Sequence, residues 1–182
     1  MKLWKTAVAA AATAAIALPL CSAAAFEPMP PPKNADFSPY LLTIPLVSPL
    51  SEIRLSSHFG WRFHPIREEM DFHTGTDLVC PEGTPVYATL SGTVIQSGWH
   101  DSYGYYLQID HYNGFSTLYA HCSKLLAKKG DSIKSGEKIA LSGQTGEATG
   151  PHLHFEVRMN GQHLNPEWLP FFSETYDTEE PA

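Results

Sequence analysis

Short runs of alternating apolar and polar side chains dominate the middle of the chain. They are rich in β-branched and aromatic residues and are bounded by glycines or Asn-Gly pairs, which is typical of β-strands joined by tight turns. The runs cover residues 86–88, 92–95, 105–109, 115–119 and 138–141. Asn113-Gly114 and Asn160-Gly161 indicate hairpins, because a primed turn needs positive φ. The pattern therefore predicts a mainly β, antiparallel domain over residues 48–170.

Helix has little support in the same pattern. Apart from an apolar run near the N-terminus, no segment repeats its apolar positions every 3.6 residues over a long stretch. We expect one short helical turn, at residues 124–129. The 15 prolines and 13 glycines of the chain also favour turns and strands. The connections between strands should therefore be short turns.

Residues 152–158 continue the alternation and carry two histidines. Successive side chains of a strand point to opposite sides, so His152 and His154 share one face while Leu153 and Phe155 share the other. The two positions on the face would lie ~6–7 Å apart, at about 3.3 Å rise per residue. Both imidazoles could work at a single metal ion. The alternative is a pair of solvated histidines on an exposed strand face.

The two ends of the chain differ in composition from this domain. Two lysines followed by an alanine-rich apolar run predict a secretory signal over residues 1–25, cleaved near Ala25. A lipid anchor on Cys21 is the alternative, and we expect membrane association only in that case. Prolines concentrate in residues 26–47, which we interpret as an extended linker or an arm on the domain surface. Residues 171–182 form an acidic C-terminal tail.

Charge and cysteine content narrow the classes of function. The formal net charge of −7 argues against a nucleic-acid-binding protein, which needs clustered Lys and Arg. With the leader removed, Cys80 and Cys122 remain as an even pair in an oxidising compartment, where they form either a disulfide or two buried thiols. Cys122 follows His121, but neighbours on a strand face opposite ways. We therefore do not expect a nucleophilic Cys–His pair.

A second cluster of polar residues lies at 73–77, with the sequence His-Thr-Gly-Thr-Asp. Fully extended, its two ends would be ~13 Å apart, and two threonines with a glycine make a poor helix. A bend at Gly75 would instead bring the imidazole of His73 and the carboxylate of Asp77 to a common point. With a third ligand from the strand of His152 and His154, this set suits zinc and leaves a fourth position for water.

The segment 115–121 ends in another histidine. His121 is either a solvated residue at a strand end or a further member of the same site. In a site with metal-activated water, an imidazole that titrates near neutral pH can accept and return protons.

Taken together, these motifs resemble the lysostaphin/LytM-type zinc endopeptidases of bacterial cell walls. The resemblance covers residues 55–166 and rests on many spaced matches. The matching segments are 57–65, 73–78, 83–88, 92–94, 119–121, 143–146, 150–156 and 165–166.

This resemblance implies an antiparallel β-sheet groove fold and zinc held by His73, Asp77 and His154. It implies that His121 and His152 activate the water and stabilise the charged intermediate. We expect hydrolysis of peptide cross-links in peptidoglycan, with the peptide stems as partner, by a monomer exported to the periplasm or cell envelope. The alternative is a non-catalytic wall-binding or hydrolase-activating module, against which the intact ligand positions argue.

The remaining polar and aromatic residues have less distinctive contexts. We expect His58 and His64 to be structural. Surface or turn positions are expected for three further histidines, His100, His111 and His163. Arg62 either meets a substrate carboxylate or forms a structural salt bridge. Four aromatic residues either line the peptide groove or pack in the core, namely Trp99, Tyr103, Tyr105 and Tyr106.

Overall fold

The computed structural model describes residues 29–30, 32–36 and 45–173. The expected signal at 1–25 lies outside them, as do most of the proline-rich segment and of the acidic tail. The described residues form thirteen strands, one 3₁₀ helix and one short α-helix. Within them no helix is long and apolar enough to cross a membrane. The mainly β architecture with little helix that the sequence predicts is confirmed.

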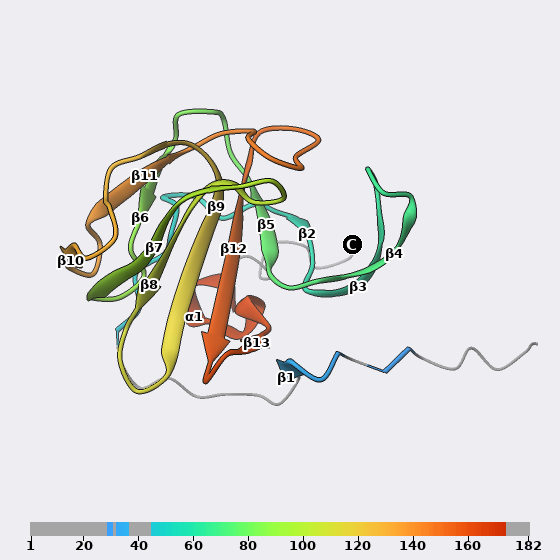
Figure 1. Cartoon of the computed structure of the whole chain (residues 1–182), viewed down its shortest axis with the longest axis horizontal. Helices are drawn as coiled ribbons and strands as arrows, with labels where there is room; N and C mark the ends of the chain where they lie inside the picture. The colour runs from blue at the N-terminus through green and yellow to red at the C-terminus, as the bar shows by residue number, and fades with distance from the viewer. Residues whose placement is uncertain (1–28, 31, 37–44, 174–182) are drawn as a thin grey trace, which may run out of the picture.

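Four long antiparallel strands form the centre of the main sheet. They run in the order β7 (Gly92–His100), β8 (Gly104–Asp110), β9 (Phe115–Leu125) and β12 (His152–Met159). On its other edge β12 pairs first with β5 (Thr76–Val79) and then with β13 (Gln162–Leu164). Figure 1 shows β9 and β12 side by side in the middle of the molecule. The strand expected to carry the paired histidines is therefore central.

Shorter elements complete the fold around this sheet. At one end β6 (Pro85–Tyr87) pairs with β11 (Lys138–Ser142), which also pairs with β9, and β10 (Ser132–Ile133) pairs with β7. The remaining short strands are β1 (Ala35–Asp36), parallel to β13, and β2 (Leu55–Ser57), antiparallel to β5. The two helices are η1 (Pro166–Trp168) and α1 (Pro170–Ser173).

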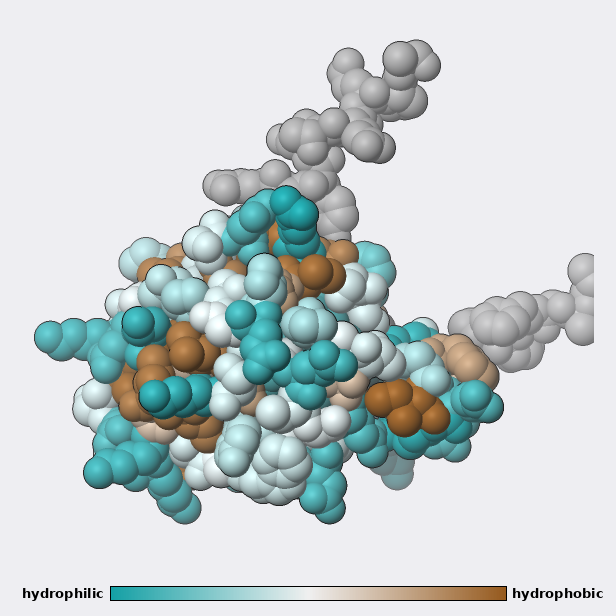
Figure 2. Space-filling view, turned by 90° about the horizontal axis from the view of Figure 1, so that it is seen from above, coloured by the Kyte–Doolittle hydropathy of each residue, from teal (hydrophilic) through white to brown (hydrophobic). Residues whose placement is uncertain are grey.

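A separate hairpin stands beside the sheet. It consists of β3 (Gly60–His64) and β4 (Glu69–His73), and it projects to the right of the main sheet in Figure 1. Figure 2 shows apolar surface at the right of the view, where this hairpin lies. The hairpin exposes three large hydrophobic side chains, those of Phe63, Ile66 and Met70. Because β4 ends at His73, the hairpin positions one of the expected metal ligands.

The two faces of β12 differ as the alternation predicts. Leu153, Phe155 and Val157 are fully buried in the hydrophobic core, together with Leu78 of β5 and Tyr119 of β9 among others. This burial supplies the main stabilisation of the sheet, at about 25 cal/mol per Å² of apolar surface removed from water. The histidines lie on the opposite face, so the core holds their strand in place without contacting the reactive side.

Both Asn-Gly hairpins are present. Asn160 and Gly161 have φ of 51° and 82° and form the two-residue turn between β12 and β13. Asn113 and Gly114 also have positive φ, within a longer turn between β8 and β9. Positive φ is costly for most residues but easily adopted by Asn and Gly, which explains why these pairs end the strands.

The helical turn expected at residues 124–129 is wrong. Lys124 and Leu125 continue β9, and the backbone N–H groups of Leu126 and Ala127 both donate to the carbonyl of Ile139, at 2.9 and 3.3 Å. Leu125 and Ala127 pack against the core from this extended segment. Tertiary pairing with β11 and apolar burial therefore override the local helix propensity.

Strand β9 contains a β-bulge at its end nearest to the histidines. Cys122 is paired with Tyr105 and Tyr119 with Leu107, so two residues of β9, Ala120 and His121, oppose one residue of β8. His121 has φ of 59°, in the left-handed region that non-glycine residues rarely adopt. Unbroken alternation from the buried Tyr119 would turn His121 toward the core. The bulge turns it toward the opposite face.

The two cysteines of the domain are both free and buried. Cys80 and Cys122 belong to the same hydrophobic core. Burial, and next the proximity of Cys80, raise the pKa of the Cys122 thiol to about 12. Of the two alternatives left open by the sequence, the structure has buried thiols.

Candidate metal centre

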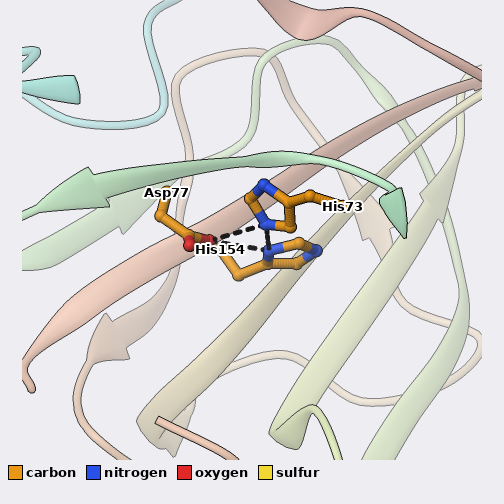
Figure 3. A group of neighbouring side chains, drawn as sticks. All are labelled: His73, Asp77 and His154. Carbon is orange, nitrogen blue, oxygen red and sulfur yellow. Dashed lines mark hydrogen bonds and ion pairs between the residues drawn. The ribbon is translucent and has the colours of Figure 1, made fainter. Parts of the chain in front are cut away.

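Three residues from separate strands converge at one point. His73 is the last residue of β4, Asp77 lies on β5, and His154 lies on β12 as the direct register partner of Asp77. Figure 3 shows the three side chains turned toward one another. Gly75 makes the expected bend possible, since a Cβ there would lie 2.5 Å from the carbonyl oxygen of Phe155 and 2.8 Å from the His154 ring. The backbone of the bend therefore rests directly on β12.

The three ligand atoms are equally spaced. Nε2 of His73 lies 3.1 Å from Oδ1 of Asp77 and 3.0 Å from Nδ1 of His154, and this Nδ1 lies 2.9 Å from the same oxygen. All three residues are buried. Such a triangle fits an ion bound at about 2.0–2.2 Å from each atom. The set that the resemblance implied is therefore assembled as a candidate metal site.

The second nitrogen of each imidazole has its own partner. Nδ1 of His73 donates to the backbone carbonyl of His58 at 2.8 Å, and Nε2 of His154 donates to Oε1 of Glu156 at 3.1 Å. A hydrogen bond at one nitrogen fixes the tautomer and leaves the lone pair of the other for a metal. His73 is thus set to bind through Nε2 and His154 through Nδ1.

Glu156 is the fully buried centre of a hydrogen-bond network. Its Oε1 also accepts bonds of 2.7 Å from the hydroxyls of Thr74 and Tyr103, and its Oε2 accepts from Nε of Arg158 at 2.8 Å. Burial alone would raise the pKa of this carboxyl, but the bond from His154 and the Arg158 charge help to hold it well below its usual value. Glu156 therefore stays ionised while it links β12 to the bend after β4.

The sequence did not single out Glu156 as a functional residue. An acidic residue two positions after His154 on a strand must share its face, and this spacing was the available signal. The structure also places Tyr103 in the cleft rather than in the core. Trp99 and Tyr105 are largely exposed, at 55% and 42%, so they do not pack in the core either.

The titration of the ligand residues follows from their mutual contacts. Burial alone would lower the pKa of His154, but its hydrogen bonds to Asp77 and Glu156 raise it to about 9. Burial also acts to raise the pKa of Asp77, yet its bonds to His154 and His73 hold it far below the usual range. In the metal-free site, His154 is therefore protonated next to the carboxylate of Asp77, and its proton competes with a cation for the ring nitrogen.

His121 and His152 form a second pair beside the ligands. Their ring centroids are 4.6 Å apart, and Nε2 of His152 lies 3.7 Å from Oδ1 of Asp77. Nδ1 of His121 donates to the carbonyl of Thr145 at 2.7 Å, and Nδ1 of His152 donates to that of Gly150 at 2.8 Å. Each ring therefore keeps Nε2 for another partner.

The environment of His121 keeps its imidazole neutral. Burial, followed by the nearby charges of His154 and His152, lowers the pKa of His121 to about 3. The free Nε2 of this neutral imidazole can accept a proton, although the lowered pKa makes it a weaker base than an ordinary histidine. This residue is therefore a candidate base, positioned by the bulge in β9.

These residues line one cleft with a volume of about 280 Å³. One wall is the β3–β4 hairpin, with Arg62 and Arg67, and another is the turn after β7, with His100 and Tyr103. All five expected site residues line it, namely His73, Asp77, His121, His152 and His154. The candidate ligands and the candidate proton-transfer pair therefore face a common space.

The other histidines have structural or peripheral positions. His64 is buried and accepts from the N–H groups of Ile66 and Arg67, and His58 is exposed beside Glu167. His100 is exposed at the edge of the cleft. The surface or turn position expected for His163 is wrong: it lies on β13 and is only 8% exposed, near Glu156. His111 is partly buried and bonds to Ser91 and Thr117.

Comparison with known proteins gives one family. The sequence model described as peptidase family M23 matches residues 71–166. The chain is 46% identical over 120 residues to a DD-carboxypeptidase/endopeptidase Mpg of Neisseria meningitidis, covering 66% of this chain and 28% of that protein. It is 44% identical over 116 residues to the peptidoglycan DD-endopeptidase ShyA of Vibrio cholerae, covering 63% and 27%. The chain thus spans less than a third of these relatives.

Solved structures resemble the fold. A zinc-containing peptidase from Vibrio cholerae is 42% identical with a TM-score of 0.61, over 64% of this chain and 37% of that one. The catalytic domain of lysostaphin from Staphylococcus simulans is 32% identical with a TM-score of 0.58, over 66% and 92%. The lysostaphin-type fold that the sequence resemblance implied is confirmed.

Proposed function

Because this chain belongs to peptidase family M23, we propose that it is an exported, zinc-dependent endopeptidase that hydrolyses peptide cross-links of bacterial peptidoglycan. The observation that carries the proposal is the convergence of Nε2 of His73, Oδ1 of Asp77 and Nδ1 of His154 on one point at the wall of a cleft. The names of two relatives, which are peptidoglycan DD-endopeptidases, support the substrate class.

The donor set supports zinc as the metal. Two imidazoles and one carboxylate are a common catalytic zinc set, and three protein ligands leave a position open in a four-coordinate site. The hydrogen bonds of His73 to His58 and of His154 to Glu156 orient both rings for this role. When bound, zinc supplies a Lewis acid that polarises a carbonyl and lowers the pKa of water.

The second pair of histidines would handle the protons. Hydrolysis adds a water oxygen to the scissile carbonyl carbon and breaks the bond to the amide nitrogen, which leaves as an amine after taking up a proton. His121, neutral and tied at Nδ1 to Thr145, accepts the proton of the attacking water at Nε2. His152 donates Nδ1–H to the carbonyl of Gly150, so it would stabilise the negative charge that develops on the carbonyl oxygen as an imidazolium, through Nε2–H.

Export follows from the substrate. Peptidoglycan lies outside the cytoplasm, and the leader-like composition of residues 1–25 is consistent with passage across the membrane. We propose the periplasm or cell envelope as the place of action. Detection of a mature chain that starts after Ala25, by N-terminal sequencing of cell-envelope fractions, would test this part separately.

The experiment that tests the activity uses the chain from residue 26 onward with purified peptidoglycan. We expect zinc at one equivalent and release of soluble muropeptides, with both lost after chelation and restored by zinc. Mass spectrometry of the products identifies the bond. Binding to the walls without release of fragments, by a zinc-loaded protein, would contradict the hydrolase and favour a wall-binding or activating module.

A further inference from the structure

The guanidinium group of Arg62 makes a single ion pair among the described residues, with Asp77. Its Nε is buried and has no hydrogen-bond partner within the described part of the chain. Its Nη2 lies 3.6 Å from Oδ2 of Asp77, outside hydrogen-bond distance. A buried N–H group without a hydrogen-bond partner costs free energy even where, as here, the rest of the side chain is 28% exposed, and a ligand that accepts from it would remove that cost.

The other arginine of the same hairpin makes a clear contrast. Arg67 forms ion pairs with Glu69, Asp71 and Glu147, including a bond of 3.0 Å to the last. Its charge is therefore balanced by three carboxylates. Among the carboxylates of the described residues, Arg62 pairs with Asp77 alone, which already accepts from His73 and His154 at Oδ1.

Arg62 also lies where two cavities meet. It lines the cleft of the metal site together with Asp77 and His152, and the same three residues line a neighbouring cavity of about 460 Å³. Of the described residues that line this second cavity, Arg62 and Asp77 are the two that carry a fixed charge. The second cavity is thus a continuation of the cleft past the metal ligands, with a cation at its entrance.

The metal makes this region more positive. A divalent cation bound by a single carboxylate leaves net positive charge at Asp77, and the charge of Glu156 is already offset by Arg158. With a cation in place, Asp77 can no longer neutralise Arg62 in full. An anionic group that enters the second cavity would then be attracted by both, and a carboxylate matches the planar guanidinium with two parallel hydrogen bonds.

We propose that Arg62 is a specificity-determining residue that binds a free carboxylate of the peptide substrate, close to the scissile bond, where the cleft opens into the second cavity. This inference rests on the proposed function and extends it to the charge of the substrate. Because Arg62 lies beside a metal ligand, the carboxylate belongs to the residue next to the scissile amide. The remainder of the second cavity, which lies beyond Arg62 and Asp77 and has no fixed charge in its lining, receives the rest of that residue.

The test compares two cross-linked peptides that differ in one group: the carboxylate next to the scissile bond is free in one and is a primary carboxamide in the other. Values of kcat/KM are measured for the wild type, Arg62→Gln and Arg62→Lys, each with its zinc content determined. A hydrogen-bonded charge pair predicts that the wild type prefers the acid by about 10- to 100-fold. Arg62→Gln should lose this preference while it still cleaves the amide, and Arg62→Lys should keep part of it.

A matched control comes from an arginine outside the cleft. Arg54→Gln removes an exposed charge that is paired with Glu52 and should leave the acid-to-amide ratio as in the wild type. If Arg62→Gln instead lowers kcat/KM for both peptides by the same factor, together with its zinc affinity, Arg62 is only a partner of Asp77 and the inference is wrong.

A binding measurement separates this inference from the proposed function. Single peptide stems that contain no scissile cross-link, in acid and amide forms, are titrated into zinc-loaded protein by calorimetry. Tighter binding of the acid by the wild type, lost in Arg62→Gln, supports the inference even if neither cross-linked peptide is cleaved. Equal binding of the two forms by the wild type overturns it, whether or not hydrolysis occurs.

Discussion

His154 presents Nδ1 to Asp77 and donates Nε2–H to Glu156, so one imidazole lies between two carboxylates at 2.9 and 3.1 Å. The first contact belongs to the candidate metal site, and the second fixes the ring for it. Glu156 in turn holds Thr74, next to His73, and Tyr103 of the cleft wall. The geometry of the candidate metal site therefore depends on a residue that is not one of its three ligands.

Replacing this buried carboxylate tests that dependence. Glu156→Gln removes the charge that keeps His154 oriented, so we expect zinc affinity to fall about 10- to 100-fold. Competition with a chromophoric chelator measures the effect. Glu52→Gln, which alters an exposed carboxylate paired with Arg54, is the matched control and should bind zinc as the wild type does. Unchanged affinity in Glu156→Gln would show that the network is not needed for the site.

The roles of two histidines can be separated by truncation. His154→Ala removes a ligand, so we expect loss of both zinc and activity. His121→Ala leaves the three ligands in place and removes the candidate base, so it should keep one equivalent of zinc while kcat falls by about 10²- to 10⁴-fold. Metal analysis of the purified variants alongside muropeptide release distinguishes the two. Equal loss of metal from both variants would contradict these assignments.

Zinc binding should release a proton. In the metal-free protein the pKa of His154 is raised to about 9, so the imidazole is protonated at neutral pH and must lose the proton to bind metal. We therefore expect zinc affinity to rise roughly tenfold per pH unit from pH 7 toward 9. Chelator competition at several pH values and constant ionic strength measures the slope. A flat profile over this interval would be inconsistent with His154 as a ligand.

The same proton contributes to the stability of the metal-free fold. Because the pKa of His154 is raised above its ordinary value of 6.5, its contribution is complete below pH 6.5 and is lost as the pH rises through 9. Zinc-loaded protein should lack this dependence. Urea unfolding of both forms across this pH range gives the comparison, and identical pH dependence in the two forms would contradict it.

The bend at Gly75 should tolerate no side chain. Gly75→Ala places a methyl group against the backbone of Phe155 and the ring of His154, so we expect a loss of about 1–3 kcal/mol in stability together with weaker zinc binding. Gly98→Ala is a suitable control, since a Cβ there meets nothing within 4 Å. Urea unfolding and zinc titration of both variants provide the measurement. Wild-type zinc affinity in Gly75→Ala would show that the bend can move.

Strand alternation and helix propensity, which depend only on neighbouring residues, were enough to predict part of this site. Alternation along a strand placed His152 and His154 on one face, and the poor helix propensity around Gly75 predicted the bend that joins His73 to Asp77. Alternation could not say which of His152 and His154 is the ligand, because that depends on the pairing of Asp77 with His154 across β5 and β12. That choice came from the family resemblance.

Long-range contacts explain the structural features that the sequence predicted incorrectly or not at all. The segment after Lys124 is held extended by hydrogen bonds to Ile139, and His163 is buried by the short strand β13, neither of which a local pattern encodes. The orientation of His121 depends on a bulge opposite Tyr106, where β9 has one residue more than β8. Strand rules without the bulge would have turned this imidazole into the core.

The left-handed backbone at residue 121 has a consequence for related sequences. Glycine or asparagine adopts this conformation with less strain than histidine does, whereas a β-branched residue does so only at high cost. If His121 is the base that we propose, selection for turnover would maintain a residue that the backbone itself disfavours. In related domains that have lost catalytic activity, we expect this position to change to glycine or asparagine while the sheet is retained. The residue at this one position would then identify domains that keep the fold without the activity.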